Sequence, residues 1–305
     1  MSTTYYAPME GHTDPIFREF LLKQNNAWGS YTTDFLRIPS QGKIPPKQFI
    51  KHFGERIFYN EAWRDKTCFQ ILVAETSQIQ PAMQTIRDLE IKKLDINLGC
   101  PSKKVCAHKG GSYLLSVPET LKEIISQIRD QYAHHLSVKI RLGFKDTNTF
   151  LQNLENFREI GVDQVIIHGR TRKQMYKGHA NWHMISMAKG KFKGLRIIAN
   201  GDIKNKNLAE ICLQTTKADG VMVARGALEN PWFFEPEKNT LQNKKKYILE
   251  YFNFLSEIDH YQKNQGHLLK RLKSNLYYLF QNYPEVRSKL LRSQSLSELS
   301  NNLKA

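Results

Sequence analysis

The sequence predicts an α/β protein with a (β/α)8 TIM barrel followed by an all-α helical bundle. Eight short apolar segments, mostly rich in β-branched or aromatic residues, alternate with amphipathic segments as far as Glu235. This alternation is typical of a parallel sheet, and eight repeats are the number that closes the sheet into a barrel. From Leu241 to Ala305 only Gly266 and Pro284 interrupt a pattern in which leucine, tyrosine and phenylalanine recur at helical spacing. We therefore expect two domains, residues 1–237 and 238–305.

The predicted strands and helices follow one another closely, except in Ser40–Lys66, which carries Pro45-Pro46 and is expected to be irregular. An open, doubly wound sheet is the alternative, but no Gly-x-Gly-x-x-Gly follows the first strand. The predicted strands are Thr4–Met9, Tyr31–Leu36, Thr67–Val73, Lys93–Leu98, Leu136–Leu142, Gln164–His168, Leu195–Asn200 and Gly220–Ala224. The predicted helices between them are Pro15–Gln24, Ser77–Leu89, Pro118–Tyr132, Thr149–Ile160, Trp182–Lys189 and Leu208–Thr216.

The composition favours a polyanionic partner and disfavours a metal or a membrane. The net charge is +16 and the pI is near 9.6, which suits phosphate binding, although a merely basic soluble protein is the alternative. Four cysteines form no CxxC pair, and so few cysteines fit a reducing cytosol. The sequence shows no signal peptide and no apolar run of membrane-spanning length. We expect a cytoplasmic, monomeric protein without a metal.

The C-terminal bundle, for which we expect three to four helices, carries part of the positive charge. Leu241–Ala305 holds 11 lysine and arginine residues against 5 aspartate and glutamate residues. Lys270, Arg271 and Lys273 fall on one predicted helix and spread over a broad face. A solvated helix face is the usual explanation of such a run, but a bundle placed after a complete barrel favours a nucleic-acid surface.

The stretch Leu94–Ser102 is predicted to carry the chemistry. Its apolar run is typical of a buried strand, which a glycine and a proline end. Asn97 and Cys100 therefore fall at the carboxyl end of the strand, where a parallel barrel places its active site. An inert buried thiol is the alternative for Cys100. The loop that follows includes Lys104, is basic, and ends in two glycines that let backbone approach a ligand.

Polar side chains on other predicted strands belong to the same end of the barrel. Gln70 lies within an apolar strand, where a buried amide must satisfy both its carbonyl and its NH2 group. Lys139 also lies in a strand, where a buried ammonium needs an anionic partner, and Arg141 shares its face by alternation. A core glutamine and a lysine that reaches outward between helices are the alternatives. His168 ends a later strand and begins a loop dense in cations.

Turns that contain glycine follow three of the strands. Ala7–Gly11 closes the first strand with a rigid turn, which is either an ordinary strand end or a support for a flat ring. Ala199–Asp202 and Ala224–Ala227 close the last two strands, where this fold has its standard phosphate site. Gly201 would let backbone N–H groups approach an anion there.

Together these segments resemble the tRNA-dihydrouridine synthases, flavin enzymes that reduce uridine in tRNA. The resemblance is carried by Ala-Pro-Met-Glu-Gly, Asn-Leu-Gly-Cys-Pro-Ser-Lys-Lys-Val and His-Gly-Arg-Thr-Arg-x-Gln-x-Tyr-x-Gly, and it spans Pro8–Leu303. Thr33–Arg37 and Ile44–Phe49 are most similar to the bacterial C-type branch, although Asp34 stands where glutamate is usual. Similarity to that branch favours position 16 of the tRNA D-loop.

The resemblance implies a role for each candidate residue. Cys100 would donate a proton to C5 of a uracil whose C6 receives a hydride from FMN, with NADPH as the reductant. Residues 1–237 would bind FMN and residues 238–305 would recognise tRNA. Flavin contact is implied for Pro8, Met9, Glu10, Gln70, Lys139, His168, Asn200, Gly201, Asp202, Ala224 and Arg225. Contact with uracil or RNA is implied for Asn97, Lys104, Arg141, Arg170, Arg172, Lys177, Lys270, Arg271 and Lys273.

Two other functions stay open at this point. A flavin dehydrogenase acting on a small pyrimidine, similar to the dihydroorotate dehydrogenases, would have a similar barrel but would not need a basic bundle. A non-catalytic RNA-binding protein could keep the barrel as a scaffold, but the joint presence of Gln70, Cys100, Lys139 and His168 argues against it.

Overall fold

The computed structural model describes residues 3–24, 27–39 and 43–304, which belong to two compact units. The first unit consists of Met1–Glu19, Trp28–Ile203 and Asn207–Val223, and the second of Phe20–Ala27, Lys204–Lys206 and Ala224–Ala305. The domain boundary after residue 237 stays a prediction. None of the described helices is both long enough and apolar enough to cross a membrane.

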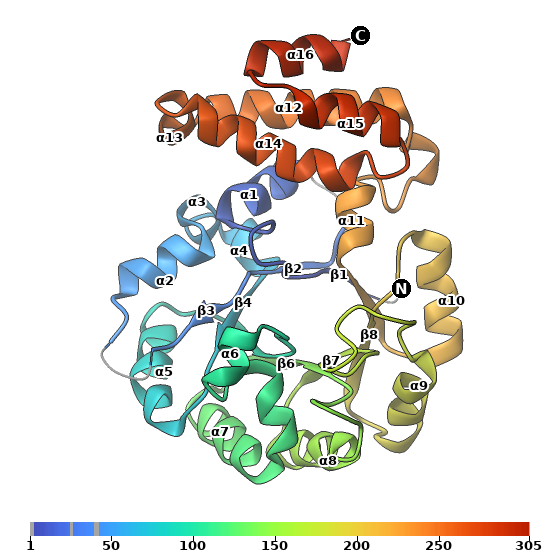
Figure 1. The fold of residues 1–305 in the computed structure, drawn as a ribbon. Helices are drawn as coiled ribbons and strands as arrows, with labels where there is room; N and C mark the ends of the chain where they lie inside the picture. The colour runs from blue at the N-terminus through green and yellow to red at the C-terminus, as the bar shows by residue number, and fades with distance from the viewer. Residues whose placement is uncertain (1–2, 25–26, 40–42, 305) are drawn as a thin grey trace. The chain divides into compact units, whose positions relative to one another are not determined.

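The first unit is a closed barrel of parallel strands, with helices around the outside (Figure 1). Its strands are β1 (Thr3–Tyr6), β2 (Ser30–Thr32), β3 (Leu36–Arg37), β4 (Thr67–Leu72), β5 (Lys93–Leu98), β6 (His135–Arg141), β7 (Gln164–His168), β8 (Arg196–Asn200) and β9 (Gly220–Val223). They follow the order β2-β1-β9-β8-β7-β6-β5-β4, and β2 pairs with β4 to close the ring. The predicted TIM barrel is therefore confirmed.

One predicted strand is wrong, because Tyr31–Leu36 is divided into β2 and the short β3, and both pair with β4. Between these two strands the Thr33 hydroxyl accepts the Gln70 backbone N–H at 2.8 Å. A side chain thus replaces one bond of the ladder. The other seven predicted strands are present, with ends shifted by up to three residues.

The prediction of irregular structure in Ser40–Lys66 is also wrong for the part that is described; residues 40–42 lie outside it. This part contains three short helices, α2 (Pro46–Phe53), α3 (Glu55–Phe58) and α4 (Glu61–Asp65). Pro46 begins α2 instead of breaking it, because the first turn of a helix does not use its N–H groups.

The remaining helices of the barrel pack an apolar face against the strands. α7 shows the pattern, since Leu121, Ile124, Ile125 and Ile128 recur at helical spacing and are all buried. All six predicted barrel helices are present. The helical segments after α4 are η1 (Thr76–Gln78), α5 (Ile79–Asp88), α6 (Lys103–Ala107), η2 (Gly111–Ser116), α7 (Pro118–Asp130), α8 (Phe150–Ile160), α9 (Trp182–Lys191) and α10 (Lys206–Thr216), with α1 (Pro15–Lys23) before them.

Strand alternation gives the barrel a polar interior. In β4 the Phe69 ring stacks on Phe49 and Phe53 of α2, so it faces the helices, and its neighbour Gln70 faces the interior. The register pairs Gln70 with Asp95, and pairs Asp95 with Ser137 on the next strand. Polar side chains from three successive strands therefore lie beside one another inside the ring.

The second unit is helical, and the described residues of its C-terminal part form five helices where three to four were predicted. Its helical segments are α11 (Arg225–Glu229), η3 (Pro236–Lys238), α12 (Leu241–Ser256), α13 (Asp259–Gln262), α14 (Gln265–Leu279), α15 (Pro284–Arg292) and α16 (Leu296–Lys304). Lys244 of α12 is buried, and its ammonium donates to the carbonyls of Glu229 and Leu279 at 2.7 and 2.6 Å. It thereby stabilises the carboxyl ends of α11 and α14.

Candidate active site

The carboxyl ends of four neighbouring strands bring the predicted site residues together. The register pairs Asn97 of β5 with Lys139 of β6, Arg141 of β6 with His168 of β7, and His168 with Asn200 of β8. In a TIM barrel this end of the strands carries the active site. The first unit therefore gathers these side chains where chemistry is expected.

The peptide of Cys100 is fixed from both sides. The carbonyl of the Asn97 side chain accepts the backbone N–H groups of Gly99 and Cys100 at 3.2 and 2.9 Å. The Ser112 hydroxyl donates to the Cys100 carbonyl at 2.7 Å. Gly111 has φ +58°, and a Cβ there would lie 3.2 Å from the Cys100 carbonyl oxygen, so glycine suits this position. The thiol is thus presented from a rigid turn.

Two arginines hold the neighbouring peptides. Arg141 Nε donates to the Gly99 carbonyl at 2.9 Å, and Arg172 Nε donates to the Pro101 carbonyl at 3.2 Å. Arg141 is only 3% exposed and also donates to the carbonyls of Thr171 and Met175. Its guanidinium is therefore buried against backbone carbonyls, and the RNA contact of Arg141 stays a prediction.

The Cys100 thiol is suited to hold a proton. It is 9% exposed, and burial raises its pKa above the ordinary value. The charges of Glu10 and Cys106 raise this pKa further, whereas Arg141 lowers it. A thiol with a raised pKa is protonated at neutral pH and can act as an acid towards a stronger base.

Lys139 makes no hydrogen bond or ion pair with any other residue that the structure describes. Part of its surface remains accessible, yet burial of the ammonium, with the charge of Arg141, lowers its pKa to about 8. The charges of Asp95 and Cys100 act on the ammonium in the opposite direction. Lys139 and Cys100 therefore lie at the same end of neighbouring strands, where an anionic ligand group would stabilise the cation.

The Gln70 amide is bonded at both ends, as expected for a buried glutamine. Its NH2 group donates to Asp95 at 2.6 Å, and its carbonyl accepts from the Asn97 amide at 2.8 Å. The Ser137 hydroxyl donates to the other Asp95 oxygen at 2.6 Å. Sequence reasoning missed Asp95, although alternation along β5 places it on the same face as Asn97.

Arg170 occupies a different environment from the one predicted. It is 2% exposed, and one of its NH2 groups donates to both carboxylate oxygens of Asp202 at 2.7 Å and to the Gly178 carbonyl. Its other NH2 group lies 3.3 Å from His168 Nε2. This side chain ties the loop after β7 to the turn after β8, and the RNA contact of Arg170 stays a prediction.

The turn after β8 is tightly packed. A Cβ at Gly201, where φ is +114°, would lie 2.8 Å from the Ala180 Cβ and 2.9 Å from the His168 ring. Glycine is therefore required here for packing as well as for any approach to an anion. Asn200 donates to the Met222 carbonyl at 2.7 Å and so joins β8 to β9.

The other candidates lie in loops or in the second unit. Lys104 and Lys177 are exposed and Arg172 is half-buried. After β1, Pro8 and Met9 are half-buried and Glu10 is exposed. In the second unit, Ala224 lies just before α11. Arg225 and Lys270 are exposed and Lys273 is half-buried. Arg271 donates to the Tyr251 hydroxyl at 2.9 Å.

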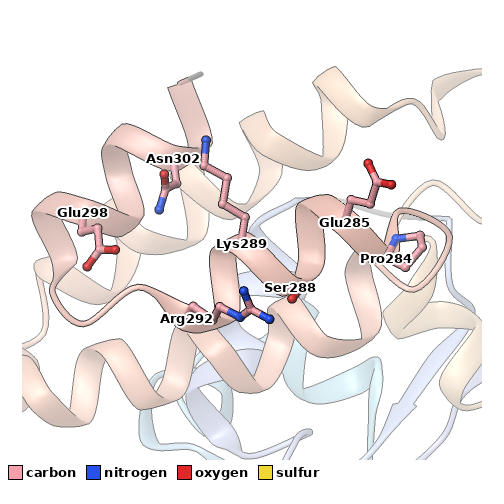
Figure 2. A pocket seen from close by; sticks show the side chains of 7 residues that line it. All are labelled: Pro284, Glu285, Ser288, Lys289, Arg292, Glu298 and Asn302. Carbon is pink, nitrogen blue, oxygen red and sulfur yellow. The ribbon is translucent and has the colours of Figure 1, made fainter.

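The second unit has a hollow of about 580 Å³ on α15 and α16 (Figure 2). Two carboxylates and two cations line it, so its charge does not select for phosphate. The lining residues are Pro284, Glu285, Ser288, Lys289, Arg292, Glu298 and Asn302.

Comparisons with known proteins agree on one family. Residues 5–304 match the family described as dihydrouridine synthase (Dus). The tRNA-dihydrouridine(16) synthase of Shewanella oneidensis is 33% identical over 230 residues, which cover 74% of this chain and 71% of that protein. The probable tRNA-dihydrouridine synthase of Aquifex aeolicus is 30% identical over 307 residues, 96% of this chain and 92% of its own.

A solved structure supports the barrel alone. Histamine dehydrogenase from Rhizobium sp. 4-9 is similar with a TM-score of 0.57 and 10% sequence identity, over 82% of this chain and 48% of that one. At this identity the likeness extends to the fold and not to the function.

Proposed function

This chain belongs to the dihydrouridine synthase family, and from that premise we propose that it reduces a uridine of tRNA to 5,6-dihydrouridine with FMN and NADPH. The observation that carries the proposal is that Cys100, just after β5, and Lys139 of the neighbouring β6 lie at the same end of the barrel, and that burial keeps the thiol protonated. When bound, FMN would supply the hydride that C6 of the uracil receives. The residues of the protein would bind the flavin, hold the base and supply the proton.

The interior residues fit a flavin. Lys139 offers a cation, and Gln70 and Asn97 each retain one side-chain N–H that no other described residue accepts. A cation and amide donors suit the carbonyl oxygens of an isoalloxazine ring and the negative charge of its reduced form. The other proposed flavin contacts are Pro8, Met9, Glu10, His168, Asn200, Gly201, Asp202, Ala224 and Arg225.

Cys100 would give its proton to C5 of the pyrimidine. Because the bonds from Asn97 and Ser112 fix the peptide on both sides, the sulfur cannot move far from the reacting carbon. After the transfer, the thiolate regains a proton from solvent. Asn97 can use its free N–H to bind a uracil carbonyl.

The target base has to leave the tRNA stack to reach this depth, as in other enzymes that act on a base. Lys104 and Lys177 are exposed and would contact the phosphate backbone, with Arg172 beside them. In the second unit we assign Lys270, Arg271 and Lys273 to RNA binding. The Shewanella relative is named a tRNA-dihydrouridine(16) synthase, which supports position 16 as the site.

A direct assay tests the proposal. Purified protein, FMN and NADPH are incubated with tRNA that lacks dihydrouridine, and the product is mapped by mass spectrometry. We expect a mass gain of two hydrogens at position 16. Gain at another uridine would overturn the position, and turnover of free uracil or orotate without tRNA would overturn the substrate.

A further inference from the structure

A hydrogen-bonded chain leads from a buried carboxylate to the peptide of Cys100. It begins at Asp95, passes through the amides of Gln70 and Asn97, and ends on the Cys100 N–H. Its three bonds measure 2.6, 2.8 and 2.9 Å. Asp95 and Gln70 are each at most 1% exposed, so water does not compete for these bonds.

The Asp95 carboxylate decides which end of each amide in this hydrogen-bonded chain donates and which end accepts. A side-chain amide can turn by 180°, which exchanges its donor and its acceptor, but an ionised carboxylate only accepts. Asp95 therefore holds the NH2 group of Gln70, which turns the Gln70 carbonyl towards Asn97. Asn97 must then donate to Gln70, and its own carbonyl is left for the backbone N–H groups of Gly99 and Cys100.

The environment of Asp95 keeps it ionised near neutral pH. Burial raises its pKa, and the hydrogen bonds from Ser137 and Gln70 and the charge of Lys139 limit the rise to about 6. The Cys68 thiol also faces it, and its own pKa is raised by burial. The carboxylate is therefore an acceptor under ordinary conditions.

We propose that Asp95 is a positioning residue, which orients both amides and so sets the Cys100 peptide and the polarity of the site. Both acceptor positions of the Asn97 carbonyl are then used, so Asn97 presents only an N–H to a ligand. This selects a carbonyl oxygen on the bound base. The inference deepens the proposed function and rests on it for the identity of that ligand.

The test exploits the contact between Asp95 and Gln70. In Gln70→Glu two carboxylates meet at the position of a 2.6 Å hydrogen bond, which repels them or forces one to hold a proton. In Gln70→Glu/Asp95→Asn the amide and the carboxylate have exchanged positions, so the single carboxylate of the chain now lies at residue 70 instead of residue 95. The relocated carboxylate accepts from both neighbouring amides, so the repulsion is removed and every group in the chain again has a partner.

Two readouts are compared in the purified holoenzymes. One is the rate of Cys100 alkylation by iodoacetamide, read by peptide mass spectrometry across pH, and the other is kcat on tRNA. We expect Gln70→Glu to lower kcat by about tenfold or more, and the added Asp95→Asn to recover part of that loss, because the glutamate at position 70 still has no N–H for the flavin. The pH profile of alkylation should shift in the single variant and return in the double variant.

A matched control adds Asp163→Asn to Gln70→Glu. Asp163 accepts from Leu136 N at 2.8 Å at the opposite end of the strands, and its change should rescue nothing. If Gln70→Glu fails to fold, a folded double variant supports the inference equally. A double variant no better than Gln70→Glu in folding, alkylation or kcat overturns it. A different result would overturn the proposed function alone: the wild-type protein leaves tRNA unreduced, while alkylation of the variants follows the expected pattern.

Discussion

The two ends of the barrel use their charged side chains differently. At the amino end of the strands, Asp219 accepts from Lys189 and from the Ile197 N–H at 2.6 and 2.8 Å. Asp163 there binds Arg129 in the same way. At the carboxyl end Lys139 has no such partner among the described residues.

This difference separates stability from function. At the amino end the charges pair with each other and with backbone of the strands, which fastens the ring. At the carboxyl end Arg170 and Asp202 also form a pair, which joins two loops, but Arg141 and Arg172 hold the peptides on either side of Cys100, and Lys139 remains for a ligand. The asymmetry agrees with the general division of TIM barrels into a stabilising and a catalytic face.

Among the changes that probe the two ends of the barrel, Lys139→Met should have the largest effect. Loss of the cation directed at the proposed flavin should lower the rate of flavin reduction by about a hundredfold. Stopped-flow absorbance at the flavin band measures this rate. Lys193→Met, at an exposed position before β8, is the matched control and should leave the rate unchanged. Equal rates in both variants would contradict the assignment of Lys139.

A pH effect of smaller size should follow from the same residue. Because burial lowers the pKa of Lys139 to about 8, its ammonium is present below pH 8 and is lost above it. The rate of flavin reduction should therefore fall as the pH rises through 8, by up to about tenfold per pH unit. The fall should be absent in Lys139→Met, and its persistence there would assign it to another group.

Asp219→Asn should affect stability and spare the chemistry. Removing the charge weakens the bonds from Lys189 and Ile197, at a cost of about 1–2 kcal/mol in the free energy of unfolding. Urea denaturation measures this change. The kcat of the folded fraction should stay at the wild-type value, and a selective loss of kcat would break the division between the two ends.

The smallest effect should come from Lys270→Gln/Lys273→Gln in the second unit. We expect a few-fold weaker binding of tRNA. The slope of log affinity against log salt concentration should become less negative by about one to two. Filter binding over a salt series measures the slope. Arg271 is left intact because it bonds to the Tyr251 hydroxyl. An unchanged slope would mean that these lysines do not contact phosphate.

Periodicity and strand ends were enough to predict the barrel and to place Cys100, Gln70 and Lys139. These predictions depend on local pattern, since alternation decides which side chains face inward. Asp95 was missed because its role arises from the register between strands, which no local pattern shows. The sequence also could not show that loop carbonyls bind Arg141 and that Asp202 binds Arg170.

The break in the strand Tyr31–Leu36 had a similar cause. Its residues have strand propensity, but the Thr33 hydroxyl bonds to Gln70 and replaces a backbone partner. Tertiary contacts of this kind override local preference.

The central claim is that the Cys100 thiol supplies the proton that completes reduction of the base. Anaerobic single-turnover mixing of Cys100→Ala with NADPH, and then with tRNA, tests it most directly. We predict that the flavin is reduced at the wild-type rate and is then reoxidised by tRNA at least about a hundredfold more slowly. Reoxidation by tRNA at the wild-type rate would contradict the account.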